Sequence, residues 1–162
     1  MGDANNVFTQ RVRFCLLAVA LGSCGNPQAH QQSAERNFQD SINKMKTLAL
    51  APYVAWTAET PPLCTSPTLK KAQDSVLFFA NRLNPRENGF STVVEAGGWV
   101  LDVADGARDR GCKKEARSLY DSVISIYTGT AYSSLRQRAQ IGIDDLRQMP
   151  DVKAASHTKI SK

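Results

Sequence analysis

Residues 92–107 read Thr-Val-Val-Glu-Ala-Gly-Gly-Trp-Val-Leu-Asp-Val-Ala-Asp-Gly-Ala, and they set the fold class. Their apolar side chains recur three or four positions apart, which is the spacing of one face of an α-helix. Thr92 and Glu95 have the spacing of a capping box, so the pattern predicts a helix that begins at Thr92. Gly97 and Gly98 each cost such a helix about 1 kcal/mol relative to alanine, and we expect a close approach of a neighbouring backbone there, or a kink.

Two helices are predicted upstream of this stretch. The first carries apolar residues spaced four, three and four positions apart, and it should end before Pro52 because proline lacks the amide hydrogen that a helix interior needs. Residues 52–67 are expected to form a loop. Ser66 followed by Pro67 is typical of a helix start, and the second helix should run from there to Asn84.

Two more helices are predicted downstream. Gly111 is typical of the residue just past a helix end. The fourth helix should run from Lys113 to Tyr127, and Thr130 should cap a fifth helix that ends at Pro150. No strand survives a test for period-2 alternation. The expected fold is therefore all-α, a small antiparallel bundle or hairpin array of about five helices.

The composition limits the class of protein. The chain has 162 residues, a formal net charge of +5, 42% hydrophobic and 22% charged residues. These values are ordinary for a globular domain and exclude wholesale disorder, and no apolar run reaches the roughly 18 residues of a membrane-spanning helix. The two histidines, His30 and His157, fall in polar terminal segments, which disfavours histidine-based nucleophiles and metal sites. We therefore predict no enzyme activity, no cofactor and no metal.

The N-terminal segment has the pattern of an export signal. Residues 14–23 are apolar or small and follow two arginines, which is typical of a secretory signal peptide. The motif Leu21-Gly22-Ser23-Cys24 resembles the lipobox of bacterial lipoproteins. That resemblance implies cleavage before Cys24 and lipid on its thiol, and three acyl chains would hold the protein stably at a membrane. Gly25, in place of aspartate, implies sorting to the periplasmic face of the outer membrane rather than the inner membrane.

The four cysteines divide accordingly. Cys15 lies in the predicted signal and Cys24 takes the lipid, which leaves Cys64 and Cys112. In an oxidising periplasm two remaining cysteines favour a disulfide, and this one would contribute up to about 4 kcal/mol. The alternative is two free buried thiols.

The sequence divides into four predicted segments. They are a signal peptide over 1–23, a flexible tether over 24–33, an α-helical domain over 34–150 and a disordered basic tail over 151–162. The tether and the tail are both polar and lack helical periodicity.

Part of the helical domain resembles a known repeat. Between about residues 97 and 146, the spacing of small and large residues, Ala104 to Ala116 in particular, resembles a tetratricopeptide helical hairpin. The resemblance implies a groove that binds a peptide or protein. Tyr120, Tyr127 and Tyr132 are the candidate binding face.

Charged residues offer two alternative sites. A basic cluster surrounds the turn after the third helix, and in an exported protein it would meet lipid phosphates or an acidic partner rather than nucleic acid, or form an ordinary charged turn; its members are Arg108, Arg110, Lys113, Lys114 and Arg117. The acidic pairs Asp102/Asp105 and Asp144/Asp145 should form ion pairs with neighbouring basic side chains.

These patterns predict a lipid-anchored, non-enzymatic adaptor or scaffold that binds a protein of the cell envelope. One alternative is a secretion-accessory lipoprotein similar in architecture to pilotins. The other is a cell-wall hydrolase that uses paired carboxylates, because acids distant in sequence can converge in a fold.

Overall fold

The computed structural model describes residues 27–150, which are helical and contain no strand, so the all-α prediction is confirmed. The predicted signal peptide, the lipobox and the predicted tail lie outside the described residues. In chain order the helices are α2 (Pro27–Thr57), α3 (Pro67–Arg82), α4 (Pro85–Asn88), α5 (Phe90–Asp109), α6 (Lys113–Ile126), the 3₁₀ turn η1 (Thr130–Tyr132) and α7 (Ser133–Gln148). Within this described part, no helix is both long and apolar enough to cross a membrane.

The chain divides into two units, Met1–Asp40 and Ser41–Lys162. In the first unit, residues 27–40 belong to α2, and every side chain from 32 to 40 is exposed. The second unit holds the buried core.

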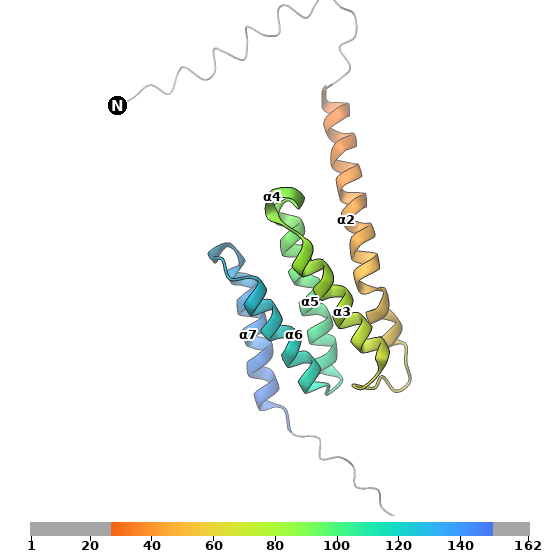
Figure 1. Cartoon of the computed structure of the whole chain (residues 1–162), viewed down its shortest axis with the longest axis vertical. Helices are drawn as coiled ribbons and strands as arrows, with labels where there is room; N and C mark the ends of the chain where they lie inside the picture. Colours follow the sequence, from red (N-terminus) through yellow and green to blue (C-terminus); the bar gives the residue numbers. More distant parts are fainter. Residues whose placement is uncertain (1–26, 151–162) are drawn as a thin grey trace, which may run out of the picture. The chain divides into compact units, whose positions relative to one another are not determined.

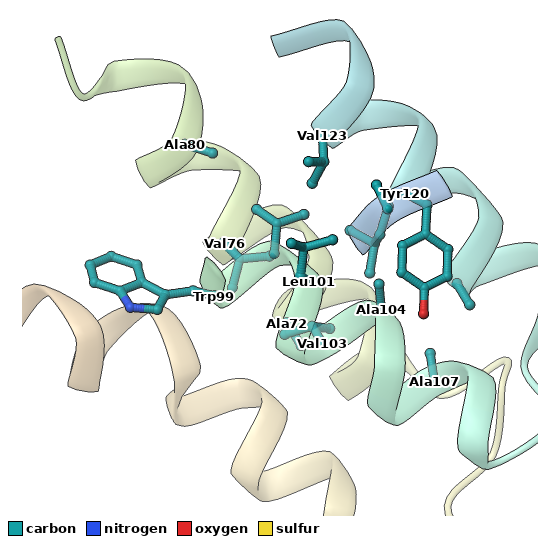
Figure 2. Packing of buried hydrophobic residues seen from close by; sticks show 14 of the residues in the cluster. Ala72, Val76, Ala80, Trp99, Leu101, Val103, Ala104, Ala107, Tyr120 and Val123 are labelled. Carbon is teal, nitrogen blue, oxygen red and sulfur yellow. The ribbon is translucent and has the colours of Figure 1, made fainter. Parts of the chain in front are cut away.

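Helix α5 is the centre of the second unit. It packs against α3, α6 and α7, and the successive helices α5, α6 and α7 run in alternating directions, as the short links predict (Figure 1). Figure 2 shows apolar side chains of α3, α5 and α6 that converge between the three helices. Ala72 and Val76 of α3 and Val100 and Ala104 of α5 all belong to this core and are fully buried.

Helix α2 differs from the prediction at both ends. It begins at Pro27, inside the segment assigned to a tether, and it continues through Pro52 to Thr57. Proline in a helix leaves the carbonyl four residues earlier without its donor, and here that carbonyl is Leu48 O. The Ser75 hydroxyl of α3 donates to Leu48 O at 3.4 Å, so tertiary contact compensates for the missing bond.

The residue beyond the proline explains why the helix continues. Trp56 is fully buried, and its indole Nε1 donates to Leu63 O at 3.0 Å. An interior proline costs a helix roughly 3 kcal/mol. Burial of the large Trp56 side chain offsets this cost, because the indole N–H is hydrogen-bonded and leaves no unpaired polar group in the core. The predicted loop is consequently shorter, from Ala58 to Ser66.

Two helix starts also differ from the prediction. Helix α5 begins at Phe90 after Gly89, whose φ of 78° makes the turn, and no side chain caps it. Thr92 is buried inside the helix, and its Oγ1 has no partner, so the capping box is wrong. Thr130 begins the 3₁₀ turn instead of capping α7, which starts at Ser133.

Two predicted helix boundaries are confirmed. Ser66 caps α3, because its Oγ accepts a bond from the Thr68 amide at 3.1 Å, with Pro67 at the first position. Gly111 follows the C-cap of α5 with φ of 77°, the left-handed conformation that glycine adopts without strain.

Candidate functional site

The three tyrosines of the predicted binding face do not form one exposed face. Tyr120 and Tyr127 are fully buried, and only Tyr132 is partly exposed. The Tyr120 and Tyr127 rings each pack against a glycine, where a larger residue would leave no room for them. A Cβ on Gly142 would lie 2.2 Å from Cζ of Tyr120, and one on Gly97 would lie 3.0 Å from Cζ of Tyr127. The close approach at Gly97 is therefore made by side chains and not by a neighbouring backbone.

The Tyr120 hydroxyl joins a charged network between α5, α6 and α7. It donates to Asp105 Oδ1 at 2.5 Å, and burial followed by this bond raises the pKa of Tyr120. Asp105 also pairs with Arg138 at 2.5 Å and with Arg108 at 3.6 Å. The side chains of Asp105 and Arg108 are only 24% and 23% exposed and that of Arg138 is 48% exposed, so this network links α5, α6 and α7 from a partly buried position.

The remaining acids that the sequence offered as a catalytic pair are also bound to arginines. Asp102 pairs with Arg138 at 3.0 Å, and Asp145 pairs with Arg108 at 3.1 Å. Asp144 pairs with Arg147 at 2.9 Å. These carboxylates act as ion-pair partners, as the sequence predicts.

Four of the five residues of the basic cluster make contacts within the domain. Arg108 bridges α5 and α7, and Arg117 pairs with Asp121 at 2.9 Å. Arg110 donates to Gly106 O at 3.1 Å, with its guanidinium 5.1 Å from the centre of the Trp56 ring. Lys113 Nζ donates to Met149 O at 2.5 Å. These contacts agree with an ordinary charged turn.

A disulfide joins Cys64 to Cys112, as predicted, with a Cα–Cα distance of 5.1 Å. It links the loop after α2 to the turn between α5 and α6, and Cys112 is fully buried. Within residues 27–150, no group of three or more His, Cys, Asp or Glu side chains is placed to hold a metal ion.

The second unit has a groove at the end where α3 and α6 terminate. Its volume is about 490 Å³, and its lining combines the last turns of α3 and α6 with α4, α5 and η1. The lining residues are Ala80, Asn81, Leu83, Pro85, Val93, Ser125, Ile126, Tyr127 and Tyr132. None of them carries a formal charge. Tyr127 and Tyr132 of the predicted binding face therefore line this groove, but Tyr120 does not.

An aromatic group forms one side of this end of the unit. Tyr132 packs edge-on against Tyr127, with ring centres 5.3 Å apart, and stacks on Phe90 at the same distance. Phe90 is 48% exposed. Burial raises the pKa of Tyr127 to about 12, and its hydroxyl has no hydrogen-bond partner among the described residues.

Sequence reasoning did not identify most of the groove. Leu83, Pro85, Val93 and Ile126 belong to four different segments, and no spacing in the sequence indicates that they meet. The one available signal was the proximity of Tyr127 and Tyr132 in the sequence.

Searches of protein families, of curated proteins and of solved structures found no match to this chain.

Proposed function

We propose that this chain is an outer-membrane lipoprotein, anchored through Cys24 at the periplasmic face, whose helical domain is a non-enzymatic adaptor for an envelope protein. The proposal rests on the sequence Leu21-Gly22-Ser23-Cys24. A thiolate is a good nucleophile, which suits Cys24 to accept a lipid.

The Cys64–Cys112 disulfide supports export. Disulfides persist in oxidising compartments such as the bacterial periplasm and are rare in the cytosol. Lipidation at a lipobox also requires export across the inner membrane. The disulfide and the Cys24 motif therefore support the same compartment.

The adaptor part of the proposal rests on the groove. Ligand sites are concave and commonly between 300 and 1,000 Å³, and the groove falls in that range. The acids and bases that a hydrolase would need are used in ion pairs between helices. A recognition role therefore has more support than a catalytic one.

Substitution of Cys24 tests the anchor. In cells of a Gram-negative host, Cys24→Ser should abolish palmitate labelling and move the protein from the membrane to the soluble periplasmic fraction. Cys15→Ser is the matched control, because Cys15 lies in the predicted signal and should be removed with it. Continued palmitate labelling of Cys24→Ser would contradict the proposal.

Crosslinking tests the adaptor role. A photo-reactive residue at Tyr132 should yield a discrete crosslinked envelope protein, whereas the same residue at exposed Ser118, outside the groove, should not. Equal patterns from both positions, or no product from either, would contradict a specific adaptor.

A further inference from the structure

The second half of α2 is apolar around its whole circumference. Residues 47–58 read Thr-Leu-Ala-Leu-Ala-Pro-Tyr-Val-Ala-Trp-Thr-Ala, without a charged side chain. One face packs into the domain, where Ala49 and Trp56, seven positions apart, are fully buried. The other face lies at the edge of the second unit, and Leu48 and Val54 are 57% and 62% exposed (Figure 1). A helix that is apolar all round is typically buried, so this exposed face indicates a partner.

The outer faces of α3 and α6 are charged instead. Helix α3 exposes Lys71 and Asp74, and α6 exposes Lys114 and Arg117. Charged side chains of this kind are typical of a helix surface that faces water. The second half of α2 therefore differs from its neighbours in what it presents to solvent.

The exposed face of α2 has the spacing of a helix–helix contact. Leu48, Ala51, Ala55 and Ala58 are all exposed and lie three, four and three positions apart, which is the spacing of a coiled-coil seam. We call these four residues the outer seam. Ala58 still continues the helix, because its amide donates to Val54 O at 3.2 Å. The outer seam is therefore a single row along about three turns.

The outer seam is complementary to itself. The spacing of three, four and three is the same in either direction, so a two-fold axis near Tyr53 superposes the seam on that of an antiparallel second copy. Leu48 would then lie opposite Ala58 of the second copy, and a large side chain would meet a small one. Ala51 would lie opposite Ala55 of the second copy.

The charges at the two ends of the seam favour the same arrangement. Lys44 is exposed four positions before Leu48, and Glu59 directly follows Ala58. In the antiparallel pair, Lys44 of one copy lies about 4.5 Å along the helix axis from the level of Glu59 of the other. Glu59 accepts a bond from Ser66 Oγ at 2.8 Å, and its carboxylate has lone pairs for a second donor. A parallel pair would instead place like charges side by side.

We propose that two copies of this chain associate as an antiparallel two-fold pair through the outer seam of α2. A contact of three helical turns is smaller than the roughly 1,600 Å² of a standard interface, so the pair is weak and transient. The outer seam shares no residue with the groove, so this inference does not rest on the adaptor proposal.

Cysteine crosslinking of the full-length chain tests the pair. Two differently tagged copies, Leu48→Cys and Ala58→Cys, are expressed together and treated with the oxidant copper phenanthroline. Mixed dimers should exceed dimers of either copy with itself at least about tenfold, because residues 48 and 58 of opposite copies lie within the roughly 7 Å that a disulfide spans. Like positions lie ten residues, or about 15 Å, apart along the axis.

Three outcomes of this experiment would overturn the proposal. Dimers of like copies in equal or greater yield would show a parallel pair or random collision. No dimer above the background of the chain without added cysteines would show that copies do not meet on this face. A crosslink from Ala58→Cys to a different protein, without mixed dimers, would assign the face to another partner.

Two matched glutamate variants test the surface. Ala55→Glu in both tagged copies places two carboxylates close together in the seam and should lower the yield of mixed dimer at least about tenfold. Ser118→Glu adds the same charge to an exposed position of α6 and should leave the yield unchanged. Both positions are exposed, so thermal unfolding should show that each variant folds. Equal yields from the two variants would overturn the proposal.

A charge exchange tests the antiparallel order. Lys44→Glu should lower the yield of mixed dimer about two- to fivefold, the effect of one exposed ion pair per contact. Addition of Glu59→Lys to the same chain restores opposite charges across the antiparallel pair and should recover the yield. No recovery in the double variant, with an unchanged melting temperature, would overturn the antiparallel arrangement.

Discussion

The two sides of α5 are held in different ways. On the α2–α3 side, a disulfide at Cys64–Cys112 and the buried Trp56 fasten a loop to the domain. On the α6–α7 side there is no covalent link among the described residues. There, Gly97 and Gly142 admit the rings of Tyr127 and Tyr120, and side chains interdigitate around them.

The two sides differ in the length of the segments that connect their helices, and this difference explains why only one of them has a disulfide. The links between α5, α6 and α7 are short, so packing alone can hold these helices together. The loop before α3 is longer and contains Pro61 and Pro62, with few apolar side chains to bury. A cross-link contributes most where the chain is otherwise least constrained, because it reduces the conformational entropy of the unfolded state.

Removal of the disulfide should have the largest effect. The paired variant Cys64→Ser/Cys112→Ser should lower the free energy of unfolding by about 4 kcal/mol, as expected for a bridge across 48 positions. Urea denaturation of the variant and of the oxidised wild-type protein measures the difference. A loss below about 1 kcal/mol would show that Trp56 and its neighbours hold this side without the bridge.

Alanine at the glycines should have an intermediate effect and should distinguish the two sides. Gly142→Ala should cost about 1–3 kcal/mol, because its Cβ would overlap the fully buried Tyr120 ring. Gly106→Ala should cost less, because the first atom it meets is the hydroxyl end of half-buried Tyr53, which can move.

Gly98→Ala is the internal control for both variants. No atom lies within 4 Å of its Cβ position, so alanine should stabilise α5 by about 0.5–1 kcal/mol through helix propensity alone. Thermal unfolding of the three variants tests the ranking. Equal melting temperatures for Gly142→Ala and Gly98→Ala would contradict the steric role of glycine on the α6–α7 side.

The two buried tyrosines should give the smallest effects, in opposite directions. Tyr120→Phe should cost about 1–2 kcal/mol, because Asp105 loses a hydrogen bond to its carboxylate. Tyr127→Phe should be neutral or slightly stabilising, because the Tyr127 hydroxyl is buried without a partner. Chemical denaturation at pH 7 distinguishes them, and a larger loss for Tyr127→Phe would contradict this assignment.

Alkaline pH extends the comparison. Burial raises the pKa of Tyr127 to about 12, above the value near 10 of an unfolded tyrosine. The native state therefore holds this proton more tightly, and its contribution is complete below pH 10 and is lost as pH rises toward 12. Between pH 9 and 11 the wild-type protein should lose about 1 kcal/mol more stability than Tyr127→Phe.

Local sequence signals predicted the helix boundaries that depend only on neighbouring residues. The Ser66-Pro67 start and the Gly111 end were correct, because a cap depends on adjacent backbone groups. The predicted breaks at Pro52 and the capping box at Thr92 were wrong. In both cases a contact or burial supplied by the tertiary fold outweighed the local preference.

The candidate site was predictable only in part. Two of the charged pairs, Asp105–Arg108 and Asp144–Arg147, followed from helix spacing. The pairs of Arg138 and of Arg108 with acids on another helix did not, and neither did the position of Tyr127 and Tyr132, but not Tyr120, at the groove. These arrangements join different elements, and no spacing within one helix specifies them.

By itself, the sequence determined the helical class, because periodicity acts over a few residues, and it predicted the Cys64–Cys112 bridge that the structure contains. The lipobox at Cys24 stays a prediction. The tertiary structure alone decided that α2 continues past Pro52, that Tyr120 is core, and that α3 and α6 end together at one groove. These features depend on which helix ends and side chains meet, and that is set by packing around α5.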